Sequence, residues 1–338
     1  MRLPALSLIL LAAAFAQAPG EKTSRMLVAP PGAGGTAEIP LTFIRGVRPG
    51  PTLALIAGNH GYEYPPILAL QQLRARLDPK RMGGAVVMVH VANMPSFLER
   101  TIYFSPVDRK NLNRVYPGRR NGSISERIAF AITREVIDKC DYLIDIHCGD
   151  GNESLRPYVY QAVTGKTQLD QAIRGLTLAF GMDHIVLDRE RPSDPAASIY
   201  CSTTAITRGK PALTVESGAL GGTDAASTNR IVNGVESVMR YLKMLDGAPL
   251  GVSRPVYFDP AVVLVSPATG ILYPRVERDQ KVVKGAVVAR VTDFFGRTLG
   301  EVRAPFDGLV LYVVATPPIQ KGQPVAFIGA ATGQGTSQ

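Results

Sequence analysis

Apolar residues recur along the chain in two patterns, which together predict strands interleaved with helices. Short apolar runs bounded by Gly or Pro are typical of buried strands, and apolar residues at helical spacing are typical of amphipathic helices. The runs that predict strands are 52–57, 85–91, 142–147, 158–163, 184–187 and 212–216. Helical spacing predicts helices after Pro65, from Ser123 to the next strand, over 166–180 and over 227–245. Strands that alternate with helices form an α/β layer fold.

The ends and the make-up of these elements refine the fold class. Residues 26–45 contain two extended runs around a turn rich in Pro and Gly, which predicts a hairpin. The run 85–91 is continuous and β-branched, as in strands that are buried on both faces. Ser123 and Glu126 have the spacing of a capping box and predict a helix start. We therefore expect a three-layer α/β/α domain over 20–247, with a mostly parallel or mixed sheet.

The pattern changes after residue 246. Residues 254–331 contain short Val-rich runs separated by Gly, Pro and Asp, without helical spacing, which predicts a small all-β domain. Residues 265–270 resemble 302–308, and each segment is followed by an apolar run and a Lys-Gly pair. Two similar halves predict a barrel-sandwich like those of biotin and lipoyl carriers. A carrier needs a modifiable Lys at a hairpin tip, and the expected tip, 295–297, has none.

The N-terminus has the features of a secretory signal. Arg2 precedes a short apolar run that ends in small residues at alternate positions, and this run is too short for an ordinary membrane span. We expect residues 1–16 to be a signal peptide cleaved after Ala16, and the mature protein to be exported, either periplasmic or secreted. The alternative is an uncleaved N-terminal anchor. No later run in the sequence is apolar enough to predict a span.

Charge and cysteine content narrow the partners. The formal net charge is +9, but Lys and Arg are scattered and do not form a block. An exported chain of this kind is a poor candidate for nucleic-acid binding, and the positive charge favours anionic small substrates or an anionic surface.

Three cysteines, Cys140, Cys148 and Cys201, are too few for a disulfide scaffold, and whether two of them pair stays open. Strand alternation turns Cys148 away from its neighbour His147, which predicts a core position.

Three side chains at the ends of predicted strands suggest a metal site. His60 and Glu63 follow the strand 52–57, and His147 ends another strand. Because sites in open α/β sheets gather at the carboxyl ends of strands, we expect these groups to meet. Two imidazoles and a carboxylate, with a fourth position for water, form a hydrolytic zinc site, so the sequence predicts one Zn²⁺ bound by His60, Glu63 and His147. Asp145 lies two residues before His147 on the same strand face and is expected to orient its ring.

Further polar residues suggest catalytic and binding roles. Glu216 ends the last predicted strand of the α/β part and could move a proton as a general acid and base. The long polar segment 93–122 contains Asn113 and Arg114, an amide and a guanidinium suited to holding a substrate carboxylate. Arg109 is a nearby cation that could polarise the scissile carbonyl. Each of these residues could instead be a solvated loop or cap residue.

These motifs resemble those of the succinylglutamate desuccinylase and aspartoacylase family, which is grouped with the zinc carboxypeptidases of the α/β/α type. The segments that carry the resemblance are 58–63, 111–118, 145–147 and 214–218. The resemblance covers nearly the whole mature chain and extends to the small C-terminal β domain. The roles it implies are zinc ligands at His60, Glu63 and His147, a base at Glu216 and a carboxylate clamp at Asn113 and Arg114.

The function predicted from these observations is an exported zinc-dependent amidohydrolase that acts as a deacylase. It would hydrolyse the amide bond of an N-acylated amino acid, or of a related substrate with a carboxylate, by means of a metal-bound water. One alternative is a metallocarboxypeptidase that acts on short peptides such as cell-wall peptides, because that activity would use the same metal, base and clamp. Another is a non-catalytic binding protein on the same fold. The sequence does not distinguish the acyl group, the amine or the oligomeric state.

Overall fold

The computed structural model of the protein describes residues 17–332, so the expected signal peptide, residues 1–16, lies outside the described residues. The strands are β1 Glu21–Val28, β2 Glu38–Arg45, β3 Arg48–Ala57, β4 Gly83–Val89, β5 Tyr142–His147, β6 Glu153–Leu155, β7 Tyr158–Ala162, β8 His184–Asp188, β9 Ala212–Glu216, β10 Val256–Val265, β11 Gly270–Pro274, β12 Lys281–Val282, β13 Val287–Thr292, β14 Thr298–Arg303, β15 Gly308–Val314, β16 Pro318–Ile319 and β17 Pro324–Thr332. The α-helices are α1 Tyr64–Arg76, α2 Met94–Glu99, α3 Ile124–Glu135, α4 Thr167–Phe180, α5 Cys201–Ile206 and α6 Ala225–Tyr241.

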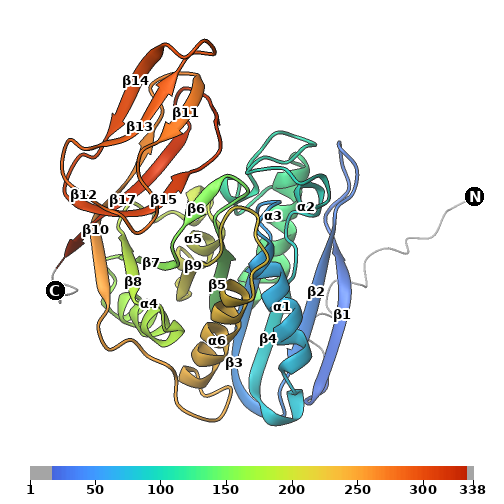
Figure 1. The fold of residues 1–338 in the computed structure, drawn as a ribbon. Coiled ribbons are helices and arrows are strands. Elements are labelled where there is room, and N and C mark those ends of the chain that lie inside the picture. The colour runs from blue at the N-terminus through green and yellow to red at the C-terminus, as the bar shows by residue number, and fades with distance from the viewer. Residues whose placement is uncertain (1–16, 333–338) are drawn as a thin grey trace, which may run out of the picture.

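A mixed sheet with helices on both faces forms the centre of the molecule (Figure 1). The order of its strands is β1-β2-β4-β3-β5-β9-β7-β8-β10-β17-β15-β12, with β6 paired to β15. Strands β4, β3, β5 and β9 are parallel neighbours, whereas β1, β2 and β7 join the sheet by antiparallel pairing. The predicted three-layer α/β/α fold with a mixed sheet is therefore confirmed.

Alternating side chains on the central strands supply two separate cores. On β3, Ala54 and Ile56 pack in the core that also contains α3 and α5. Leu53 and Leu55 point to the opposite face and pack in the core formed with α1, α4 and α6. Because both faces of the central strands are covered, their sequences read as continuous apolar runs.

The C-terminal strands form a lobe beside the α/β layers (Figure 1). A second, antiparallel sheet has the order β14-β13-β11-β16, which confirms a small C-terminal β unit. Strand β10 also pairs in parallel with β8, so the main sheet continues into the C-terminal strands. The three residues of β6 pair with β15, which ties the segment just after β5 to this lobe. These two connections were not predicted from the sequence.

Two elements differ from the predicted ones, in each case because of capping. The long polar segment 93–122, for which no helix was predicted, contains α2, where the Asn93 side chain accepts a hydrogen bond from Ser96 N. The last helix of the α/β part was expected over 227–245. The structure starts α6 at Ala225, because the Asp224 side chain caps it by accepting from Ser227 N at 2.8 Å. The same helix ends at Tyr241.

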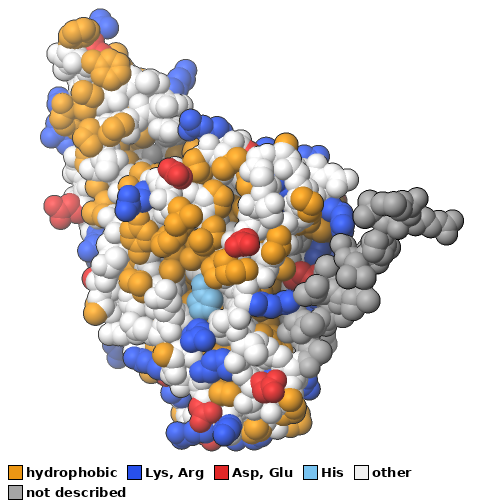
Figure 2. All heavy atoms as spheres, turned by 90° about the vertical axis from the view of Figure 1, so that its right-hand side faces the viewer, with side chains coloured by type: hydrophobic (Ala, Val, Ile, Leu, Met, Phe, Trp, Pro, Cys, Tyr) orange, Lys and Arg blue, Asp and Glu red, His pale blue; other side chains and the backbone are white. Residues whose placement is uncertain are grey.

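The surface of the described part is mixed in character. On the face drawn in Figure 2, Lys and Arg side chains are scattered and do not form a continuous basic patch. Within 17–332, none of the helices combines the length and the apolar character needed to cross a bilayer.

Candidate active site

Three parallel strands bring the predicted site residues to one edge of the sheet. Ala57, the last residue of β3, pairs with Ile146 of β5, and His147 of β5 pairs with Glu216 of β9. The chain leaves β3 at Gly58, whose φ of +70° is costly for residues with a Cβ atom. A Cβ atom there would also lie 3.0 Å from the backbone of Val91. This tight exit directs the following loop over the ends of the strands.

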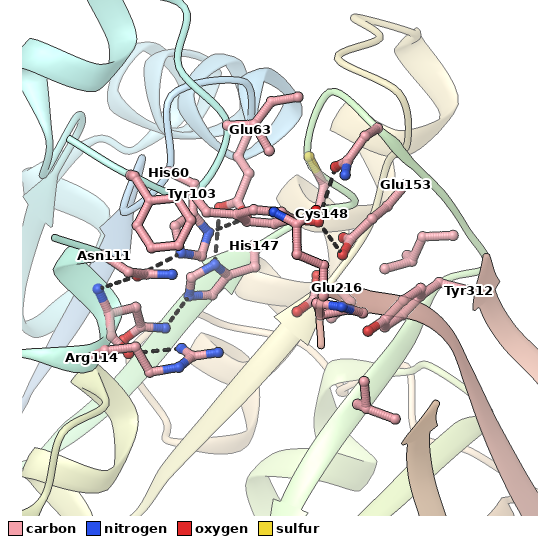
Figure 3. Close-up of a pocket in the computed structure, with 18 of the residues that line it drawn as sticks. His60, Glu63, Tyr103, Asn111, Arg114, His147, Cys148, Glu153, Glu216 and Tyr312 are labelled. Carbon is pink, nitrogen blue, oxygen red and sulfur yellow. Dashed lines mark hydrogen bonds and ion pairs between the residues drawn. The ribbon is translucent and has the colours of Figure 1, made fainter. Parts of the chain in front are cut away.

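His60, Glu63 and His147 converge at this edge (Figure 3). His60 Nδ1 lies 2.7 Å from Glu63 Oε1, and His147 Nδ1 lies 2.9 Å from Glu63 Oε2. All three residues are buried. The Glu63 carboxylate thus lies between the two rings, and each of its oxygen atoms contacts the Nδ1 atom of one ring.

The remaining ring nitrogens are held from behind by oxygen atoms. His60 Nε2 lies 3.1 Å from Asn111 Oδ1, and His147 Nε2 lies 3.0 Å from Asp145 Oδ1. Asn59 Nδ2 donates to the same Asp145 oxygen at 2.9 Å. These contacts fix the orientation of both rings, so that the two Nδ1 atoms face the Glu63 carboxylate. Histidines that bind a metal through one ring nitrogen are commonly oriented in this way by a hydrogen-bond partner at the other nitrogen.

Burial and the charges of the neighbouring groups shift the pKa values of His60, Glu63 and His147. Burial would raise the pKa of Glu63, but the two adjacent imidazoles outweigh it and lower that pKa to about 2. Burial would lower the pKa of His60 and of His147, but the Glu63 carboxylate raises both, and Asp145 adds to the effect at His147. The three side chains therefore form one tightly coupled charged group.

This donor set fits a zinc ion. One ligand atom from each of His60, Glu63 and His147 can be chosen so that all lie within 4.8 Å of one another. Imidazole nitrogen and carboxylate oxygen are the donors of catalytic zinc sites that use three protein ligands.

A cavity of about 1240 Å³ opens beside these residues and contains Glu216 in its wall. Burial raises the pKa of Glu216 well above its usual value, and Glu63 raises it further, against the opposing effect of His147. Its Oε2 atom is buried and has no hydrogen-bond partner among the described residues. A carboxyl group with a raised pKa, close to a substrate space, is suited to taking up and releasing a proton.

Asn113 and Arg114 also line this cavity. Asn113 Nδ2 lies 3.2 Å from His147 Nε2, and its Oδ1 accepts from Cys201 N at 2.8 Å. Arg114 donates to Asn113 O at 2.8 Å, and its guanidinium lies 4.6 Å from the centre of the Tyr200 ring. The guanidinium is thus positioned by neighbours that carry no negative charge, which leaves its own charge available to an anionic ligand.

Arg109 is not brought to the site. The residue is exposed and is absent from the cavity wall. Its neighbour Asp108 accepts hydrogen bonds from Ser125 N and Oγ, which hold this turn on the first residues of α3. Arg109 itself has a φ of +58°. The arginines that line the cavity in the described part of the chain are Arg114 and Arg191, so the geometry gives no support for Arg109 at the scissile carbonyl.

The cysteines are buried as free thiols, so no disulfide forms between Cys140, Cys148 and Cys201. The expectation for Cys148 is corrected in part. It is buried, as predicted, but it also lines the cavity, because the chain leaves β5 after His147 and strand alternation ends there. Burial raises the pKa of the Cys148 thiol well above its usual value, with Glu63 raising it further, so this thiol stays protonated.

The structure adds residues that the sequence did not single out. Tyr103 lies edge-on to His60, with 5.9 Å between ring centres, and donates from its hydroxyl to Glu153 Oε1 at 2.7 Å. Its φ of +57° is unfavourable for a tyrosine, and its N–H is held by Asp150 Oδ2 at 3.0 Å. Glu153 could have been suspected from the sequence, because it lies in a short polar segment directly after His147. No sequence pattern marked Tyr312, which enters the cavity wall from β15.

Comparison with known proteins gives one family. Residues 49–242, more than half of the chain, match the model of the succinylglutamate desuccinylase/aspartoacylase catalytic domain. The chain is 30% identical over 303 residues to the N-alpha-acetyl-L-2,4-diaminobutyric acid deacetylase of Halomonas elongata, which covers 87% of this chain and 86% of the relative.

Solved structures show the same fold. The product-bound ectoine utilization protein EutE (DoeB) of Ruegeria pomeroyi aligns with a TM-score of 0.81 and 27% identity, over 93% of this chain and 96% of that chain. A succinylglutamate desuccinylase/aspartoacylase from Rhodobacter sphaeroides aligns with a TM-score of 0.80 at 23% identity, over 93% and 96% of the two chains.

Proposed function

Because the chain belongs to the succinylglutamate desuccinylase/aspartoacylase family, a family of deacylases that hydrolyse amide bonds, we propose that it is a zinc-dependent deacylase of N-acyl amino acids. The observation that carries this proposal is the convergence of His60, Glu63 and His147 beside a cavity that also contains Glu216. The relative from Halomonas elongata is named for an N-acetylated amino acid. N-acetyl amino acids are therefore the first substrates to test.

The side chains of the cavity can divide the work of hydrolysis. Zinc held by His60, Glu63 and His147 would supply Lewis acidity, which polarises a carbonyl group and makes water more acidic. Arg114 binds the substrate carboxylate and thereby places the amide bond at the strand ends. Glu216 takes a proton from the attacking water on Oε2 and returns it to the amine that leaves, so that the amine departs as a neutral group.

Arg114→Ala should raise KM by about 10- to 100-fold with a smaller change in kcat, because a charged hydrogen-bond partner of the substrate is lost. The expected effect is on binding, since Arg114 lies in the cavity wall and not among the coupled groups around Glu63. Steady-state kinetics with an N-acetyl amino acid would measure it.

Arg109→Ala is the matched control for this variant. It removes the same charge five residues away, from an exposed side chain outside the cavity, and should leave KM close to the wild-type value. Equal KM values for Arg114→Ala and the wild-type protein would rule out the clamp.

The size of the cavity favours one second candidate. A volume of about 1240 Å³ is larger than a small N-acetyl amino acid requires and could hold a short peptide. A metallocarboxypeptidase would use the same carboxylate clamp and proton carrier. Assays of the zinc-loaded protein against N-acyl amino acids and against short peptides separate the two functions, because turnover of peptides alone would favour the peptidase.

We also propose that the mature protein is exported, on the basis of the apolar run and small residues within 1–16. Expression of the full chain in a bacterial host should yield a mature form that begins at Gln17 in the periplasmic or secreted fraction. N-terminal sequencing of that fraction is the measurement. A full-length chain that stays in the cytosol would contradict export, and an uncut chain in the membrane would favour the anchor.

A further inference from the structure

The cavity continues from the proposed metal site along the C-terminal lobe. Both sheets of the lobe contribute to its wall, since Val263 lies on β10 of the main sheet and Ile271 lies on β11 of the second sheet. The volume of the whole cavity, about 1240 Å³, exceeds the roughly 300–1,000 Å³ of usual small-molecule sites. We use the name lobe groove for the part lined by the apolar residues Val263, Ile271, Phe294, Pro317, Pro318 and Ile319.

Charge is divided unequally between the two parts of the cavity wall. The charged residues of the wall belong to the α/β part and include Arg114 and Glu216. Within the described chain, the lining residues that come from the lobe are all uncharged. The lobe is not poor in charge elsewhere, because Lys284 and Arg297 are exposed on it. The uncharged wall is therefore a property of the groove and not of the lobe as a whole.

Two apolar side chains of the lobe groove are exposed to solvent. Val263 is 43% exposed, and Phe294 is 73% exposed. The turn that carries Phe294 is held in shape, because Asp293 Oδ1 accepts from the N–H groups of Phe295 and Arg297 at 3.0 and 2.9 Å. Exposed apolar surface that continues a substrate cavity gains free energy when an apolar ligand covers it.

Tyr312 lines the cavity on the side of His147 that carries Glu216, whereas Arg114 lies on the other side (Figure 3). Tyr312 belongs to β15 of the lobe. Burial raises the pKa of its hydroxyl well above the usual value, and the nearby carboxylates raise it further, so the ring stays neutral. A substrate whose carboxylate binds Arg114 therefore extends past the strand ends towards the lobe.

Glu153 also lies in the cavity wall, but its oxygen atoms are already hydrogen-bonded. Oε1 accepts from the Tyr103 hydroxyl at 2.7 Å, and Oε2 accepts from Asp150 N at 3.3 Å. Burial raises the pKa of this carboxyl group to about 7. Because protein groups satisfy both oxygens, Glu153 does not require a polar partner from the substrate.

The lobe groove suits an alkyl chain better than a peptide. A peptide backbone needs hydrogen-bond partners, and Pro317 and Pro318 have no N–H to donate. The N–H groups of two further lining residues are used within their own turn, since Gln320 N donates to Gln323 Oε1 at 2.8 Å and Gln323 N donates to Gln320 O at 3.0 Å. An alkyl chain needs no such partners.

We propose that the lobe groove binds the acyl chain of the substrate, so that the preferred substrates are amino acids N-acylated with a long aliphatic chain. The proposal rests on the proposed function, and it assigns Val263 and Phe294 as specificity-determining residues. The substrate carboxylate binds Arg114, the amide bond lies at the strand ends, and the alkyl chain runs past Tyr312 into the groove. Hydrolysis adds one water across the amide bond and releases the long-chain carboxylic acid and the free amino acid.

A series of substrates that differ only in chain length tests this assignment. For the zinc-loaded protein, kcat/KM should rise by about 100-fold from N-acetyl-L-alanine through N-hexanoyl-L-alanine to N-decanoyl-L-alanine, mainly through KM. Each methylene group contributes about fourfold when it is fully buried and less in an open groove. The assays use concentrations below micelle formation. A kcat/KM that is constant or falls along the series would overturn the proposal, as would faster turnover of short peptides than of N-decanoyl-L-alanine.

Neighbouring residues supply matched controls for two variants. Val263→Asp should lower the ratio of kcat/KM for the decanoyl and acetyl substrates by about 10-fold, because the chain would have to cover a carboxylate. Val262→Asp should leave the ratio unchanged, since Val262 is 39% exposed but lies outside the cavity wall. Equal ratios in these two variants would contradict the groove.

The second pair of variants lies at the tip of the hairpin between β13 and β14. Phe294→Ala should lower the same ratio by about threefold, whereas Phe295→Ala should leave it unchanged, because Phe295 is 96% exposed and lies outside the cavity wall. Both side chains are exposed, so neither variant removes a core residue. A ratio that falls equally in both would contradict the assignment of Phe294.

Binding of the acid product separates this proposal from the proposed function. Calorimetry of the zinc-loaded protein with decanoate and with acetate needs no turnover. Tighter binding of decanoate, weakened in Val263→Asp and kept in Val262→Asp, would support the groove even if no N-acyl amino acid were hydrolysed. Hydrolysis of N-acetyl amino acids without any dependence on chain length would leave the proposed function intact and overturn the groove.

Discussion

Replacing Glu216 by glutamine should lower kcat by about 100- to 10,000-fold, the range that general acid–base catalysis contributes. The amide has the shape of the carboxyl group but cannot take a proton from water and return it to an amine. Since Oε2 of Glu216 has no hydrogen-bond partner among the described residues, the substitution breaks no hydrogen bond at that atom. The loss of rate should therefore not come from a collapsed site.

Three measurements on Glu216→Gln test this interpretation together. Zinc content and thermal stability should remain close to the wild-type values, and KM should change far less than kcat. Glu190→Gln is a suitable control, because Glu190 also lies in the cavity wall but is exposed, so its kcat should stay near that of the wild-type protein. A Glu216→Gln variant with nearly full activity would show that another group moves the proton.

The sequence predicted the site residues best where a strand fixed their direction. His147 and Glu216 end two strands that are parallel neighbours, and the two residues lie opposite each other in the register of the sheet. Alternation along β5 correctly placed Asp145 on the face of His147, where the two side chains are 3.0 Å apart. In a strand the direction of a side chain follows from the period of two residues, so a short apolar run carries this information.

The sequence was less informative where a loop or a distant strand determined the position. Arg109 and Arg114 lie in the same polar segment, yet Asp108 holds the first of them on α3 and away from the cavity. Arg127 sits beside the expected apolar face of α3 but is only 1% exposed. Its guanidinium donates to carbonyl groups of loops 92 to 97 residues away in the chain, which no local pattern could indicate.

The sequence also did not predict that the C-terminal lobe contributes a residue to the cavity wall. Tyr312 lies on β15, which pairs with the three-residue strand β6 and places Tyr312 opposite Leu155. Strands this short carry almost no periodic signal, and pairing between segments far apart in sequence is set by tertiary packing. The β domain could thus be predicted as a unit, whereas its part in the site could not.

His147→Ala should abolish stoichiometric zinc binding, because a site with three protein ligands loses one of them. The change also leaves the buried Glu63 carboxylate with one imidazole partner in place of two, at His60. Asp145→Asn should have a smaller effect, a loss of zinc affinity of about 10- to 100-fold, since it alters only the partner behind the ring. Zinc affinity should therefore fall less in Asp145→Asn than in His147→Ala, a graded order that a general loss of folding would not produce.

Zinc per chain, measured by mass spectrometry after dialysis, and competition with a chelator would establish the order of these variants. His90→Ala is the control: His90 Nε2 lies 2.8 Å from Thr42 Oγ1, away from the cavity, and this variant should bind zinc as the wild-type protein does. Circular dichroism of each variant checks that it is folded. Full zinc occupancy in folded His147→Ala would mean that the ion binds elsewhere. The buried charged groups at the ends of β3, β5 and β9 would then not be a zinc site.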